Sequence, residues 1–77
     1  MYYTKIIVQH KDGSKAQGAK VSLSISGILS GGVTSNSYTD RHGEATISHE
    51  SRGSAKVLVN GTTRTTIQVP GETVVFI

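Results

Sequence analysis

Three histidines are the side chains of this chain best suited to bind a metal ion or to transfer protons. His10, His42 and His49 are separated along the sequence, and none belongs to a short pair such as His-x-His. A metal site needs several such ligands to converge, with acidic residues completing the shell. Because each histidine adjoins an expected turn or strand end, we predict exposed histidines, no metal site and no cofactor.

Nucleophilic catalysis would require a serine held beside a histidine and an acid. Serine, histidine and aspartate are all present, but no serine lies in a nucleophile-elbow pattern. The serines at positions 22, 24 and 26 alternate with apolar residues, as on the outer side of a strand. We therefore expect no catalytic residues and no enzymatic activity.

A glycine-rich segment at residues 27–32 could be mistaken for a phosphate-binding loop. No Lys-Ser or Lys-Thr pair follows it, and no helix is expected after it. Loops on a rigid sheet nevertheless often carry binding residues. Ile28 and Leu29 in this loop, with Tyr38 beside it, are therefore candidate ligand contacts, and a carbohydrate is the ligand class that an exposed tyrosine favours.

The charge of the chain is mildly basic and evenly spread. Eight Lys and Arg residues and five acidic residues give a net charge of +3. A nucleic-acid-binding protein usually concentrates its basic residues on one stripe, with aromatic platforms among them. The three tyrosines are the only aromatic candidates, so nucleic acid is disfavoured as a partner, and a small nucleic-acid-binding barrel is kept only as an alternative.

Length and composition predict a single domain over residues 1–77. A chain of 77 residues buries only about 60% of the surface that its unfolded form exposes. It has no cysteine, and no apolar run approaches the roughly 20 residues that span a bilayer. The first residues lack the layout of a signal peptide. The compartment is therefore open: a cytosolic protein, or a domain of a longer exported or cell-surface chain.

Alternating apolar and polar residues predict about seven short strands and no helix. The alternation is clearest over residues 19–26, where apolar residues occupy the odd positions. One apolar face indicates a sheet half buried against a core. The fold class predicted is a small, antiparallel, seven-stranded β-sandwich, with a small barrel as the alternative. The expected strands are residues 2–10, 19–26, 33–39, 44–48, 55–60, 64–69 and 72–77.

Three turns are predicted to have structural roles. Asp40 can accept hydrogen bonds from its own turn, and Gly43 tolerates positive φ. Asn60-Gly61 is a hairpin signal, because a type I′ turn requires positive φ at both central residues. Pro70-Gly71 fits the central positions of a type II turn.

The apolar faces of the strands predict both a core and an interface. Residues 6–8 and 74–77 are apolar on both faces of their strands, although a half-buried strand needs only one apolar face. The residues left over for a second buried surface are Ile7, Val75 and Ile77. With Leu58, which is on the polar side of its strand, they form a candidate interface for a second copy or a neighbouring domain. Two alternatives stay open: the 27–32 loop covers these residues, or both terminal strands are central. The predicted core consists of Val21, Leu23, Ile25, Ile47, Val57, Ile67 and Phe76.

The order of turns and strands resembles a known class of domain. An Asp12-Gly13 turn precedes the run 18–23 (Gly-Ala-Lys-Val-Ser-Leu), and Thr39-Asp-Arg-His-Gly-Glu-Ala-Thr-Ile47 and Gly53-Ser-Ala-Lys-Val57 follow. This resembles the carboxypeptidase regulatory-like domains of the transthyretin-like (prealbumin) sandwich, and is similar to bacterial immunoglobulin-like domains of the invasin/intimin type. The resemblance implies a non-catalytic module of a larger exported or surface protein, which spaces, stabilises or binds. Ala16-Gln17 departs from a pattern that favours proline there.

We therefore expect a non-catalytic structural or protein-binding module. Its partner would be another protein, a neighbouring domain or a second copy of itself. The alternatives are a carbohydrate- or ligand-binding module that uses Tyr38 and the 27–32 loop, and the small nucleic-acid-binding barrel.

Overall fold

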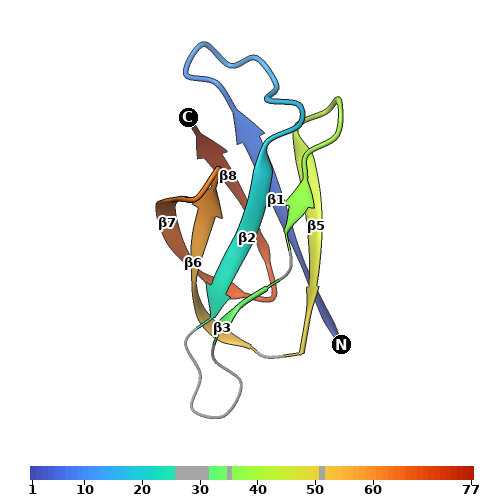
Figure 1. The fold of residues 1–77 in the computed structure, drawn as a ribbon, viewed down its shortest axis with the longest axis vertical. Helices are drawn as coiled ribbons and strands as arrows, with labels where there is room; N and C mark the ends of the chain where they lie inside the picture. The colour runs from blue at the N-terminus through green and yellow to red at the C-terminus, as the bar shows by residue number, and fades with distance from the viewer. Residues whose placement is uncertain (26–31, 35, 51) are drawn as a thin grey trace.

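The computed structural model describes residues 1–25, 32–34, 36–50 and 52–77, and every regular element in these ranges is a β-strand (Figure 1). The loop residues Ile28 and Leu29 lie outside the described residues. The strands are β1 (Tyr2–Gln9), β2 (Lys20–Ile25), β3 (Gly32–Val33), β4 (Ser37–Tyr38), β5 (Glu44–His49), β6 (Gly53–Val59), β7 (Thr62–Val69) and β8 (Glu72–Phe76).

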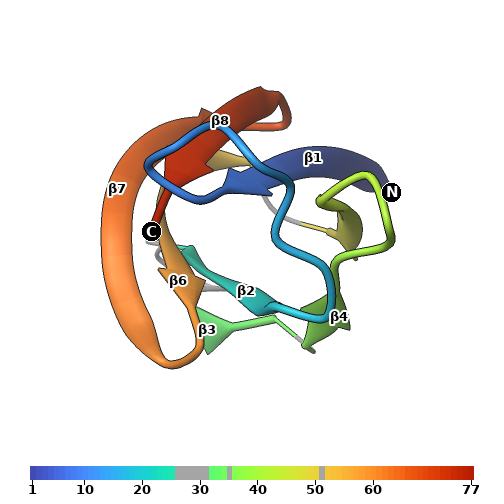
Figure 2. The same ribbon diagram turned by 90° about the horizontal axis from the view of Figure 1, so that it is seen from above.

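These strands form two sheets packed face to face, as Figure 2 shows from above. One sheet has three strands in the order β5-β1-β8, and the other has the order β3-β2-β6-β7, with β4 also paired to β2. Because β6 occupies one side of β2, β3 and β4 share the other side and together form one interrupted edge. The small all-β sandwich predicted from the sequence is therefore confirmed, with seven strand positions.

One pairing departs from the expected antiparallel pattern. β1 and β8, the first and last strands, run parallel, with Lys5 opposite Glu72 and Gln9 opposite Phe76. Every other pairing between strands is antiparallel. This parallel pair is compatible with the chain path, because the chain crosses to the second sheet between β1 and β8 and no hairpin joins the two strands.

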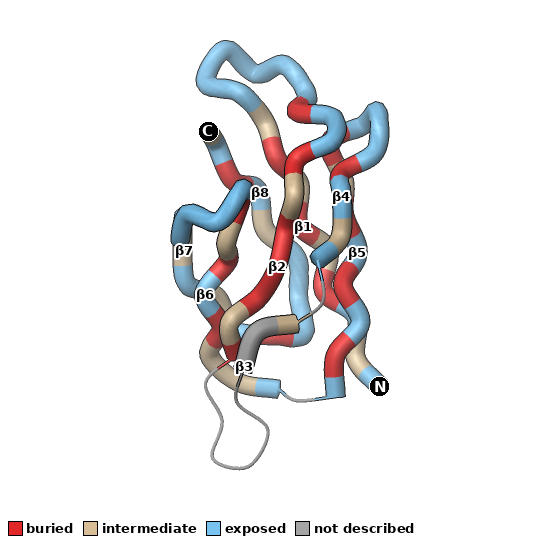
Figure 3. The backbone as a smooth tube through the Cα atoms, viewed as in Figure 1, coloured by how far each residue is buried: buried red, intermediate tan, exposed pale blue. Residues whose placement is uncertain are grey.

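The core lies between the sheets and follows from period-two alternation. Figure 3 shows buried residues alternating with more exposed ones along the strands. Val21, Leu23, Ile25, Ile47 and Val57 are buried, as predicted. The remaining buried apolar residues are Ile6, Val8, Ala16, Ala19, Ala45, Ala55, Val59, Val69 and Val75.

The prediction of which face of β8 points inward was wrong. Phe76 is 55% exposed and Val75 is 4% exposed. Ile67, also predicted as core, is only partly buried. All four residues 74–77 are apolar, so alternation alone cannot choose the inner face of this strand. The pairing with β1 decides it, because Val75 lies opposite the fully buried Val8.

The turns differ in how closely they follow the sequence signals. Gly43 has a φ of 74°, and Asn60 and Gly61 have φ values of 53° and 83°. The Val69–Pro70 peptide bond is cis, and the φ of Gly71 is outside the left-handed region. A type II turn needs positive φ at its third residue, so the type II prediction for Pro70-Gly71 was wrong.

Candidate protein-binding face

The outer face of the three-stranded sheet carries the main exposed apolar surface of the described residues. Ile7 of β1 lies opposite Val74 of β8, and Phe76 follows two residues further along β8. Val74 and Phe76 are 43% and 55% exposed, and Ile7 is half-buried between neighbouring strands. We call these three residues the β8 patch. Phe76 is also paired with Gln9, so the patch continues into a neutral polar side chain.

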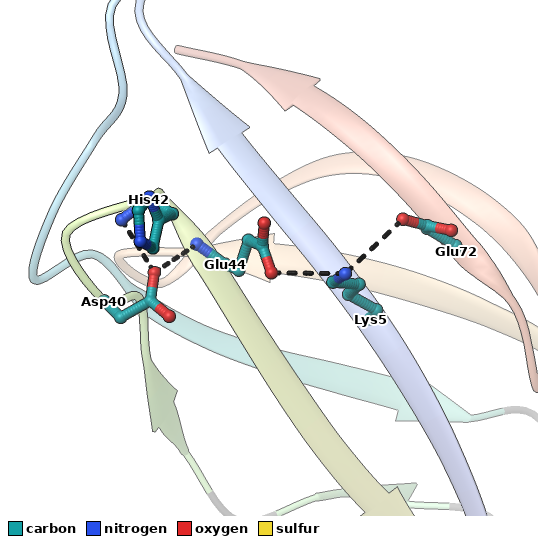
Figure 4. A network of polar contacts seen from close by, with 5 residues as sticks. All are labelled: Lys5, Asp40, His42, Glu44 and Glu72. Atoms are coloured by element: carbon teal, nitrogen blue, oxygen red, sulfur yellow. Dashed lines mark hydrogen bonds and ion pairs between the residues drawn. The ribbon is translucent and has the colours of Figure 1, made fainter.

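An ion-pair ladder, drawn in Figure 4, crosses the same face. It adjoins the β8 patch, because the pair Lys5–Glu72 lies two positions before the pair Ile7–Val74 in the register. The Lys5 ammonium lies 3.2 Å from a carboxylate oxygen of Glu44 on β5 and 3.9 Å from one of Glu72 on β8. The hydrogen bond with Glu44 and the charges of both carboxylates raise the pKa of Lys5. These exposed pairs add little stability, but they neutralise the only cation in the strands of this sheet.

The Asp40 turn leads into this ladder and orients Glu44. Asp40 Oδ1 accepts hydrogen bonds from the backbone N–H groups of His42 and Glu44, at 2.8 and 3.1 Å. These two bonds, the one from Glu44 first, lower the pKa of Asp40. The turn therefore fixes the start of β5, where Glu44 reaches towards Lys5.

The second sheet is called the four-stranded sheet below, because β3 and β4 share one strand position beside β2. Its outer face has a different chemistry. Its strands contain Lys20, Lys56 and Arg64 and no acidic residue. Tyr38, 64% exposed, lies opposite Lys20 in the β2–β4 pairing. The predicted ligand residue Tyr38 therefore adjoins a lysine, whereas its proposed neighbours in the 27–32 loop are outside the described residues.

The four residues predicted as an interface are not brought together. Val75 is buried, which overturns its assignment to an exposed surface. Ile77 is partly buried against the core. Ile7 is on the outer face of the three-stranded sheet, whereas Leu58 is on β6 in the other sheet. Only Ile7 belongs to the β8 patch.

Sequence analysis missed Val74 and Phe76 as surface residues. Both faces of β8 are apolar in the sequence, which predicts that one of them is exposed. The sequence does not indicate which of the two faces that is. The Lys5 ladder had no signal in the sequence, because its three residues come from strands that are distant along the chain.

His49 is buried rather than exposed, contrary to the sequence-based expectation. Its Nε2 atom lies 2.7 Å from the hydroxyl oxygen of buried Thr4, and its ring stacks on Tyr2 with centroids 6.0 Å apart. His10 and His42 are exposed. Among the described residues no group of three His, Cys, Asp or Glu side chains could hold a metal ion.

Comparisons with known proteins add no family assignment. No protein-family model matches the sequence, and no match is found among the curated proteins. In the part of the chain that the structure describes, no helix has the length and apolar character needed to cross a membrane.

Proposed function

We propose that this protein is a non-catalytic structural or protein-binding module of a larger exported or surface assembly. The observation that carries the proposal is the β8 patch, in which two exposed apolar side chains and a half-buried one adjoin on the outer face of a sheet. Full burial of a wholly exposed apolar side chain contributes about 1.5–3 kcal/mol, and Val74 and Phe76 have only about half of their surface left to bury. Contiguous exposed apolar groups of this kind are typical of protein interaction sites.

The distribution of strands between the sheets favours the transthyretin-like part of the resemblance. In immunoglobulin constant-type domains the first two strands belong to the same sheet. Here β1 and β2 belong to different sheets. This difference from the constant-type arrangement supports the prealbumin-like comparison, and the spacing or binding role that this resemblance implies is the one we propose.

The proposal is tested by affinity capture with matched variants. The protein is immobilised and exposed to an extract of the organism that encodes it. We expect at least one protein to be retained by the parent and lost with the double variant Val74→Ser/Phe76→Ser. A Lys56→Ala control on the opposite face should retain it. Retention that is equal for the parent and the double variant would contradict this assignment of the binding face.

A second candidate function, carbohydrate binding, is favoured by Tyr38 beside Lys20 on the acid-free sheet. An aromatic ring next to a cation suits an anionic sugar. Addition of an acidic oligosaccharide should then shift the backbone NMR signals around Tyr38, and Tyr38→Ala should abolish the shifts. Shifts that appear only with single-stranded DNA, and that weaken steeply with salt, would indicate the nucleic-acid alternative.

A further inference from the structure

We propose that β8 pairs with β8 of a second copy, in antiparallel orientation about a two-fold axis, so that the two three-stranded sheets become one six-stranded sheet. This inference rests on the proposed function, because it names the partner of the β8 patch. Four independent features of the described residues support it: the edges of the two sheets, the direction of backbone groups, the distribution of charge and the placement of the patch.

β8 is the least protected sheet edge among the described strands, because its one charged residue, Glu72, lies at its start. Natural proteins protect edges with short strands, bulges, charges or covering segments. The β3/β4 edge consists of two strands of two residues each. The β7 edge carries Arg64 beside a register shift. Part of the β5 edge adjoins β4, whose Ser37 Oγ donates a hydrogen bond to the Thr46 carbonyl.

The backbone of β8 is directed for pairing with a further strand. Lys5 N–H donates to the Gly71 carbonyl, and Ile77 N–H donates to the Gln9 carbonyl. Odd-numbered residues of this segment therefore direct their backbone groups to β1. Backbone groups alternate sides along a strand, so Glu72, Val74 and Phe76 direct theirs to the free edge, where no described strand pairs with them.

Charge favours the antiparallel direction for the pairing of two β8 strands. Glu72 is the only charged residue of β8 and lies at its start. Antiparallel pairing centred on Val74 places Glu72 opposite Phe76 of the partner, whereas parallel pairing would place the two carboxylates side by side. In the antiparallel register, all three free N–H groups and all three free carbonyls of each strand obtain partners.

The same register extends the apolar surface across the junction. Ile7 is already paired with Val74 within one copy, so the two-fold axis brings two Val74 side chains together between two Ile7 side chains. Glu44, which lies opposite Ile7 on β5, closes this row at each end. The β8 patch of each copy thus becomes the centre of a continuous outer face.

Solution mass distinguishes this arrangement from a monomer. We expect sedimentation equilibrium to show a monomer–dimer equilibrium at about 0.1–1 mM protein. Val74→Lys should give a monomer, because two lysines would meet at the axis. Because the side chain is exposed in one copy, this variant should melt at the same temperature as the parent does at dilutions where the parent is monomeric. Thr46→Lys places the same charge on the same face but on β5, and should leave the dimer intact. A parent that is monomeric throughout this range overturns the proposal.

Disulfide trapping tests the register of the β8–β8 pair directly. Unlike Val74→Lys, it introduces no charge at the two-fold axis. Residues directly opposite each other in a hydrogen-bonded antiparallel pair have Cα atoms about 5.5 Å apart, within the range of a disulfide, and the chain has no cysteine of its own. Val74→Cys should form a covalent dimer under mild oxidation, and a mixture of Glu72→Cys with Phe76→Cys should form the heterodimer. Thr46→Cys should not.

Faster cross-linking of Thr46→Cys than of Val74→Cys would overturn the two-fold pairing. A monomeric parent whose patch variants still lose a captured protein would overturn the self-pairing alone and leave the proposed function standing.

Discussion

At the scale of single residues, Gly43 is the position where backbone and packing constraints coincide. Its φ of 74° lies in the left-handed region. A Cβ atom added there would lie 2.5 Å from the carbonyl oxygen of Val8, which is closer than real Cβ atoms approach. Gly43 N–H also donates to the Asp40 carbonyl. The turn that starts β5 therefore depends on a residue without a side chain.

Gly43→Ala should destabilise the protein more than Gly13→Ala does. Both glycines have positive φ, but nothing lies within 4 Å of a Cβ on Gly13. Backbone strain alone costs about 1–3 kcal/mol, and only Gly43→Ala adds the clash with Val8. Urea denaturation measures both free energies of unfolding. Equal losses for the two variants would show that the clash relaxes without cost.

The Asp40 turn predicts a loss of stability in acid. The folded-state pKa of Asp40 is lowered from its ordinary value of 3.8. Such a group stabilises the fold above its unfolded pKa, and the stabilisation is lost as the pH falls through the folded pKa. The melting temperature of the parent should therefore exceed that of Asp40→Asn at pH 6, and the difference should shrink as the pH falls below about 4. A constant difference between pH 6 and pH 2 would contradict the assignment.

At the scale of elements, β8 offers a direct comparison of its two faces. Val75 is buried and Val74 is 43% exposed, so the same substitution has different effects at neighbouring positions. Val75→Ala should cost about 1–3 kcal/mol through lost burial and a cavity. Val74→Ala should change stability by less than about 0.5 kcal/mol when measured on the monomer. Chemical denaturation at low protein concentration checks both, and the reverse order would restore the original inward assignment of Phe76.

Sequence alone sufficed for elements whose two faces differ in polarity. The inner residues of β2, β5 and β6 follow alternation, and the described structure places them in the core. The same logic failed for β8, because all four residues 74–77 are apolar and only the register with β1 selects the inner face. His49 shows a second limit: it is buried through Thr4 and Tyr2, which lie more than 40 residues away in the chain.

The candidate site was predictable in part. Two apolar faces on β1 and β8 predicted an exposed apolar surface, and Ile7 was assigned to it. The other members of the β8 patch depend on strand pairing that is distant in sequence, as does the Lys5 ladder. Local periodicity cannot predict the parallel β1–β8 pairing, which brings Val74 beside Ile7 and Glu72 beside Lys5.

At the scale of the whole molecule, the two outer faces differ in charge and polarity. Strands of the three-stranded sheet contain one lysine and two glutamates, whereas those of the four-stranded sheet contain three cations and no acid. A binding partner on one face is therefore chemically unsuited to the other. The two functions proposed above would therefore use different faces of the module.

The parallel β1–β8 pairing also determines how the domain responds to force. The chain ends lie towards opposite ends of the long axis (Figure 1). Tension applied through the two termini pulls β1 and β8 past each other and loads all their ladder hydrogen bonds together. Because Lys5 lies opposite Glu72, where β8 begins, a handle at Gly71 instead of the C-terminus would open the ladder one bond at a time. Single-molecule pulling should therefore give a higher unfolding force through residues 1 and 77 than through residues 1 and 71, so a chain built from such domains would resist extension.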